Sequence, residues 1–126
     1  MRVWICAAAA NGFIAVAVAS FAAHGLGEAV AAERLDWVDT GVRYQIVHAL
    51  ALLAVALLHE RHGDRPRTLG VAGWGFLLGT VLFAGGLYVM AFSGWRGIGV
   101  IVPLGGIAFL IGWAALFIFG LRMSQR

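Results

Sequence analysis

Histidine, tyrosine and arginine side chains form the most chemically capable group in this sequence. Tyr44 and His48 stand four residues apart, so on a helix their side chains share one face. An imidazole inside an apolar helix could relay a proton, bind a metal or haem iron, or hydrogen-bond to a neighbouring helix. His24 and Tyr88 fall near the ends of other apolar segments, and Arg43 adds a cation that attracts anionic groups. The predicted polar cluster, a candidate ligand site, is therefore His24, Arg43, Tyr44, His48 and Tyr88.

The acidic residues argue against an enzyme. All six lie outside the long apolar segments, in the stretches 24–39 and 59–67. The apolar segments therefore hold no carboxylate pair for acid–base chemistry and no His-Glu-x-x-His motif for a catalytic metal. The single cysteine, Cys6, cannot form an intramolecular disulfide, and one thiol does not make a zinc site. We expect a protein with no catalytic residues, no metal and no resident cofactor.

The elements that must position the polar cluster are transmembrane helices. Of the 126 residues, 62% are hydrophobic and 12% are charged, which is typical of a membrane protein and not of a nucleic-acid-binding one. About 20 apolar residues cross a bilayer. The charges divide the chain into four such spans, near residues 3–23, 41–58, 70–92 and 97–120. Because short connections favour antiparallel neighbours, we predict an all-α polytopic membrane protein whose residues 1–126 form one antiparallel four-helix transmembrane bundle.

The connecting segments predict how the chain lies in the membrane. Residues 24–39 mix acidic residues with Leu35, Trp37 and Val38, which favours a short interfacial helix between the first two spans. All nine basic residues are arginines, and the four spans place six of them on one side of the membrane: Arg2, Arg61, Arg65, Arg67, Arg122 and Arg126. The positive-inside rule puts that side in the cytoplasm. We therefore predict a multi-pass plasma-membrane protein with both termini in the cytoplasm.

Glycines recur within the spans. Small residues let transmembrane helices approach closely where no hydrophobic effect draws them together. We predict that helix packing depends on Gly75, Gly79, Gly85, Gly86, Gly105 and Gly106. An alternative is that Gly85, Gly86 and Pro103 loosen the third and fourth spans around a bound molecule or a pathway, because glycine and proline free backbone groups.

Four motifs in fixed order carry a family resemblance. They are residues 21–26 (FAAHGL), 44–53 (YQIVHALALL), 83–88 (FAGGLY) and 103–106 (PLGG), the last followed by Gly112-Trp113. Together they resemble the domain of unknown function 423 family of small bacterial membrane proteins, which is related to the transmembrane protein 256 group of eukaryotes. The resemblance covers essentially the whole chain. It implies a four-span bacterial inner-membrane protein and no established activity.

Three functions fit these features. The first is a non-enzymatic accessory or assembly subunit of a larger membrane complex, packing in the lipid bilayer against other membrane subunits or a second copy of itself. The second is a small oligomeric transporter or channel, in which His48 binds or relays a proton and Arg43 attracts an anion. The third is a haem- or quinone-binding protein. The scarcity of titratable groups in the spans favours the first function.

Overall fold

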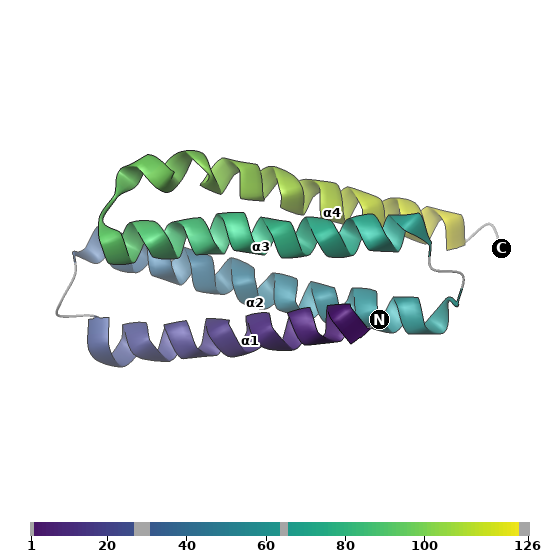
Figure 1. Ribbon diagram of the computed structural model, residues 1–126, viewed down its shortest axis with the longest axis horizontal. Coiled ribbons are helices and arrows are strands. Elements are labelled where there is room, and N and C mark those ends of the chain that lie inside the picture. Colours follow the sequence, from purple (N-terminus) through teal and green to yellow (C-terminus); the bar gives the residue numbers. More distant parts are fainter. Residues whose placement is uncertain (1, 27–30, 64–65, 124–126) are drawn as a thin grey trace.

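The computed structural model describes residues 2–26, 31–63 and 66–123, and this part of the chain is almost entirely helical (Figure 1). Its long helices are α1 (Arg2–Phe21), α2 (Ala32–Arg61), α3 (Arg67–Ser93) and α4 (Val102–Met123). A π-helical segment, Ala22–Leu26, continues α1, and a 3₁₀ segment, Arg96–Val100, precedes α4. All four long helices are long and apolar enough to cross a membrane. The predicted all-α class, with four helices able to span a membrane, is confirmed.

The helices follow one another across the molecule in chain order (Figure 1). α1 packs along α2, α2 along α3 and α3 along α4, each antiparallel to its neighbour. About half of the residues in the spanning parts of α2 and α3 are buried, whereas α1 and α4, at the two edges, leave most of theirs exposed. In a bilayer, those exposed apolar faces contact lipid or another membrane protein.

The second span is longer than the sequence suggested. α2 runs unbroken over 30 residues, so residues 32–39, which we expected in a separate interfacial helix, form its first two turns; residues 27–30 of that expected helix lie outside the described part. Val38 explains the difference, because its side chain is 1% exposed and packs against Ala91 of α3 instead of facing the membrane surface. Arg34 adds a hydrogen bond from its Nε to the carbonyl oxygen of Ala91.

The connection between α3 and α4 is tied to the same end of α2. Gly94 ends α3 in the left-handed conformation, with φ of 73°, which glycine adopts at little cost. Arg96 then pairs with Glu33, with 2.8 Å between a guanidinium nitrogen and a carboxylate oxygen. The same guanidinium lies 5.4 Å from the ring centre of Trp37, within the range of a cation–π contact. These contacts set the start of α2 against the start of α4.

Glycines bring the backbones of neighbouring helices together. An added Cβ would come within 3.0 Å of an atom of the adjacent helix at each of Gly75, Gly79, Gly86 and Gly105. The packing prediction is wrong for Gly85 and Gly106, where an added Cβ would have no neighbour within 4 Å. Those two glycines lie beside the close contacts and turn away from them, a difference that depends on how each helix is rotated about its axis.

Candidate functional site

His48 lies near the middle of α2 with 4% of its surface exposed, and both of its ring nitrogens have partners. Nδ1 lies 2.7 Å from the carbonyl oxygen of Tyr44, one turn earlier, and Nε2 lies 3.0 Å from Nε1 of Trp113 on α4. An indole N–H only donates, so Nε2 must accept, and Nδ1 carries the proton that is donated to the carbonyl. The imidazole is therefore held as one neutral tautomer that joins α2 to α4.

Aromatic rings enclose this imidazole. Phe109 stacks on it with 3.6 Å between ring centres, Phe76 lies at 5.5 Å, and the Tyr44 ring is nearly parallel to it at 6.2 Å. A second proton on Nε2 would point at the indole N–H of Trp113, and a metal or haem iron would need the same lone pair. The arrangement suits a hydrogen bond between helices better than proton transfer or ligation.

A second buried network joins three helices. The Tyr88 hydroxyl of α3 donates to Oε1 of Gln45 at 2.8 Å, Nε2 of Gln45 on α2 donates to Oδ1 of Asn11 at 3.0 Å, and Nδ2 of Asn11 donates to the carbonyl oxygen of Ala7 within α1 at 2.8 Å. Asn11, Gln45 and Tyr88 are each less than a tenth exposed. Hydrogen bonds of this kind hold transmembrane helices together because an unpaired polar group in hydrocarbon is costly.

The predicted polar cluster is divided by the fold. Only Tyr44 and His48 come together as expected, whereas Tyr88 belongs to the network of Gln45. Arg43 points outward and pairs with Asp39 on its own helix at 3.1 Å, with 77% of its side chain exposed. His24 lies exposed in the π-helical continuation of α1. The single cluster we expected is therefore two internal networks and two surface residues.

Four important residues were absent from the predicted site. They are Asn11, Gln45, Phe109 and Trp113. Asn11 had a usable signal, because a lone amide in the middle of an uncharged span must find a partner on a neighbouring helix. For the two aromatic residues, the type alone does not distinguish a ring that packs on His48 from one that faces lipid.

The arrangement of metal-ligating side chains gives no support to a metal centre. Among the residues that the structure describes, no three or more histidine, cysteine, aspartate or glutamate side chains lie close enough to hold a metal ion. The buried polar side chains of Asn11, Gln45, His48 and Thr80 instead pair with other side chains or with backbone carbonyl oxygens. Their chemistry is structural, in that it sets the rotation and spacing of the helices.

The fold and these networks define a small four-span helical membrane protein with an internally satisfied polar core. The chain belongs to the family described as "Protein of unknown function (DUF423)", whose sequence profile matches residues 18–106. It is 46% identical to a "UPF0382 membrane protein" of Haemophilus influenzae over 86% of this chain and 85% of the relative.

Two further relatives agree with this assignment. The "UPF0382 inner membrane protein YgdD" of Escherichia coli K12 is 36% identical over 94% of this chain and 89% of the relative. The "UPF0382 membrane protein YwdK" of Bacillus subtilis is 37% identical over 97% of this chain and 98% of the relative. No solved structure matches the chain. The predicted family and the inner-membrane character are confirmed.

Proposed function

We propose that the protein is a non-enzymatic accessory subunit that binds a transmembrane helix of another membrane protein in a groove between α1 and α2. The groove has a volume of about 310 Å³ and an apolar lining. Its lining residues are Ile5, Ala8, Ala9, Gly12, Val16, Ile46, Ala49, Leu50 and Leu53. From Ile5 to Val16 it follows α1 for roughly 16 Å at 1.5 Å per residue, about three helical turns.

Gly12 is the residue that carries this proposal. An added Cβ at Gly12 would have no neighbour within 4 Å, so packing inside the molecule does not require glycine there. Glycine within a helix costs about 1 kcal/mol relative to alanine, which favours a role outside the molecule. Ala8 and Gly12 are four residues apart on the groove face, and this spacing of small residues is typical of close contact between transmembrane helices.

The alternative functions have less support in the geometry. A transporter using His48 needs a free ring nitrogen, and both nitrogens are bonded inside the protein. An anion pathway through Arg43 needs this cation to face the interior, yet it is exposed and pairs with Asp39. A haem iron would compete with Trp113 for Nε2 of His48. The relatives also carry no enzymatic name.

Co-purification of the full-length protein from its own membrane tests the proposal. Gly12→Leu fills the groove, while Gly106→Leu makes the same change at a glycine of α4 that is equally free of neighbours and lies outside the groove. After gentle detergent extraction, native mass spectrometry should show a different polypeptide bound to the wild type and to Gly106→Leu, and at least tenfold less of it on Gly12→Leu. Equal retention by both variants, or a complex containing only copies of this chain, would refute the proposal.

A further inference from the structure

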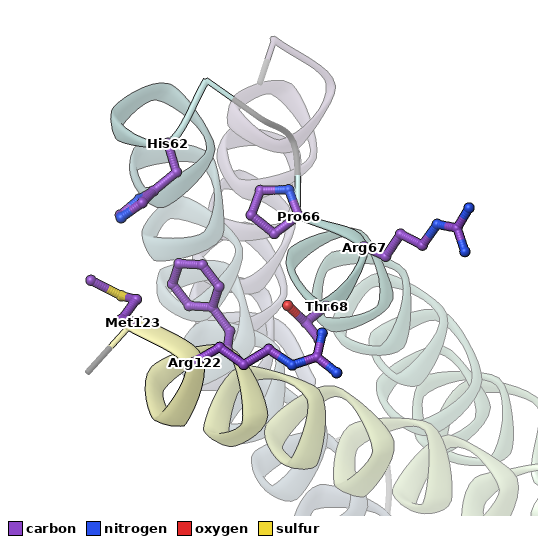
Figure 2. A pocket seen from close by; sticks show the side chains of 7 residues that line it. His62, Pro66, Arg67, Thr68, Arg122 and Met123 are labelled. Atoms are coloured by element: carbon purple, nitrogen blue, oxygen red, sulfur yellow. The ribbon is translucent and has the colours of Figure 1, made fainter. Parts of the chain in front are cut away.

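A cleft opens at the end of the molecule where α2 ends, α3 begins and α4 ends (Figure 2). Its volume is about 320 Å³. It is lined by His62, Pro66, Arg67, Thr68, Phe119, Arg122 and Met123. This end carries the larger share of the arginines, and the apolar helices end here. Because a helix that crosses a bilayer leaves the hydrocarbon near its ends, we expect this end at the depth of the lipid headgroups. We call it the basic cleft.

The arginines of the basic cleft differ from those at the opposite end. There, Arg43 and Arg96 are each paired with a carboxylate. Arg67 and Arg122 form no ion pair with any residue that the structure describes. Glu60, the described carboxylate nearest to them in sequence, does not line the cleft. The basic cleft therefore presents the positive charge of Arg122, which is unpaired among the described residues and which an anionic ligand would neutralise, and Arg67 adds a second such charge at its border.

Hydrogen-bond donors converge on the same space. Pro66 precedes α3 and supplies no capping side chain; its carbonyl oxygen accepts bonds from the N–H groups of Leu69 and Gly70, at 3.0 and 3.3 Å. Within the described residues, the N–H groups of Arg67 and Thr68 have no acceptor. In Figure 2 the guanidinium of Arg122 extends towards Thr68. The guanidinium N–H groups and the Thr68 hydroxyl therefore border one side of the cleft. Phosphate oxygens suit such a set of donors.

The other side of the basic cleft is apolar. Phe119 is 5% exposed and forms the floor, with the His62 ring edge-on to it at 5.3 Å between ring centres. Figure 2 shows the guanidinium of Arg67 pointing away from the cleft. Arg67 also lines a second, apolar groove of about 580 Å³ between α3 and α4, which Trp74 and Ile111 border. A free phosphate would use only the donors, whereas a phospholipid would also use the floor and the groove.

We propose that the basic cleft binds the phosphate of an anionic phospholipid headgroup, with the glycerol end on Phe119 and an acyl chain in the groove beside Arg67. This site lies at the opposite helix pair from the α1–α2 groove and does not depend on it. The side chain with the largest share in recognition is Arg122, because it approaches the hydroxyl of Thr68 and has no competing carboxylate among the described residues. Each basic residue near a membrane surface contributes about 1 kcal/mol, which corresponds to roughly fivefold in binding.

Lipid binding by the full-length protein in nanodiscs tests the proposal. Phosphatidylcholine discs with or without phosphatidylglycerol are compared, and protein-bound lipid is counted by native mass spectrometry. Arg122→Gln should lower the preference for phosphatidylglycerol about fivefold. Arg43→Gln removes the same charge at the other end, but Asp39 already neutralises that arginine, so the preference should stay unchanged. Thr68→Val keeps the shape and the charge and should lower the preference for phosphatidylglycerol by a smaller factor. This variant tests the assignment on its own if Arg122→Gln does not fold.

Three results would overturn the proposal. An equal fall in phosphatidylglycerol preference in Arg122→Gln and Arg43→Gln would mean that the net charge of the protein attracts the lipid, without a specific site. A preference unchanged in both Arg122→Gln and Thr68→Val would place the lipid elsewhere. Protection from thermal unfolding by inorganic phosphate in phosphatidylcholine discs, equal to that given by phosphatidylglycerol, would assign the basic cleft to a soluble phosphate compound.

Discussion

Two adjacent glycines of α4 should respond in opposite directions to the same substitution. A Cβ added to Gly105 would lie 2.7 Å from Cβ and 2.8 Å from Cα of Phe83 on α3, and even closer to its backbone nitrogen. The backbone of Phe83 cannot turn aside as the end of a flexible side chain can, so α4 would have to move outward by roughly 1 Å to restore an ordinary contact with its nitrogen. At Gly106 the added Cβ would meet no atom within 4 Å.

The magnitudes follow from these contacts. Overpacking an interface costs about 1–3 kcal/mol, so Gly105→Ala should lower the free energy of unfolding by this amount. Gly106→Ala should raise it by about 0.5–1 kcal/mol, because alanine loses less backbone entropy in a helix. The two variants should therefore differ by about 1.5–4 kcal/mol.

Steric trapping in mixed micelles measures this free energy for a membrane protein without extrapolation from denaturant. Far-ultraviolet circular dichroism of both variants before the titration checks that the helices are intact. Equal stabilities, or a more stable Gly105→Ala than Gly106→Ala, would mean that α4 is rotated differently against α3. In that case the assignment of Gly105 to the close contact with Phe83 would be refuted.

Three further predictions address the networks and the orientation. Tyr88→Phe should lower the free energy of unfolding by about 1 kcal/mol, since it leaves Oε1 of Gln45 without its donor. Tyr44→Phe is the control, because Tyr44 is 45% exposed, and an equally large loss in that variant would contradict the prediction. Nitrogen-15 spectra of labelled His48 should show the Nδ1–H tautomer, with Nε2 shifting when Trp113→Phe removes its donor; an Nε2–H tautomer in the wild type would disprove the assignment. A reporter that is active only in the periplasm should remain inactive when fused after residue 126, and activity there would reverse the orientation.

The spans were predictable because their signal is local. A charged side chain is so costly in hydrocarbon that the gaps between charges mark where the chain crosses the membrane. The start of α2 was missed because Val38 is surrounded by charges in the sequence, which suggested the membrane surface. Its burial against Ala91 of α3 is a contact 53 positions along the chain, which no local pattern reports.

The candidate site was harder to predict because it depends on helix rotation. Tyr44 and Tyr88 are the same residue type at comparable places near the ends of their spans, yet one stacks on His48 and the other donates to Gln45. A rotation of either helix by one residue, about 100°, would exchange such partners. A single hydrogen bond between helices fixes each rotation, and it forms only when the helices pack, so the sequence of one helix does not reveal it.

Asn11 connects the interior of the protein to the surface proposed for docking. α1 lies at one edge and packs mainly along α2, while Trp4 near its start and Phe21 at its end also contact aromatic rings of α3. The bond from Gln45 to Asn11 turns the amide inward, which presents Gly12, about 100° further round the helix, to the groove. The polar network therefore has a consequence at the lipid-facing surface, since it determines which residues of α1 another helix would meet. Under the proposed function, a polar group held inside an apolar span in this way would serve recognition through the orientation that it imposes.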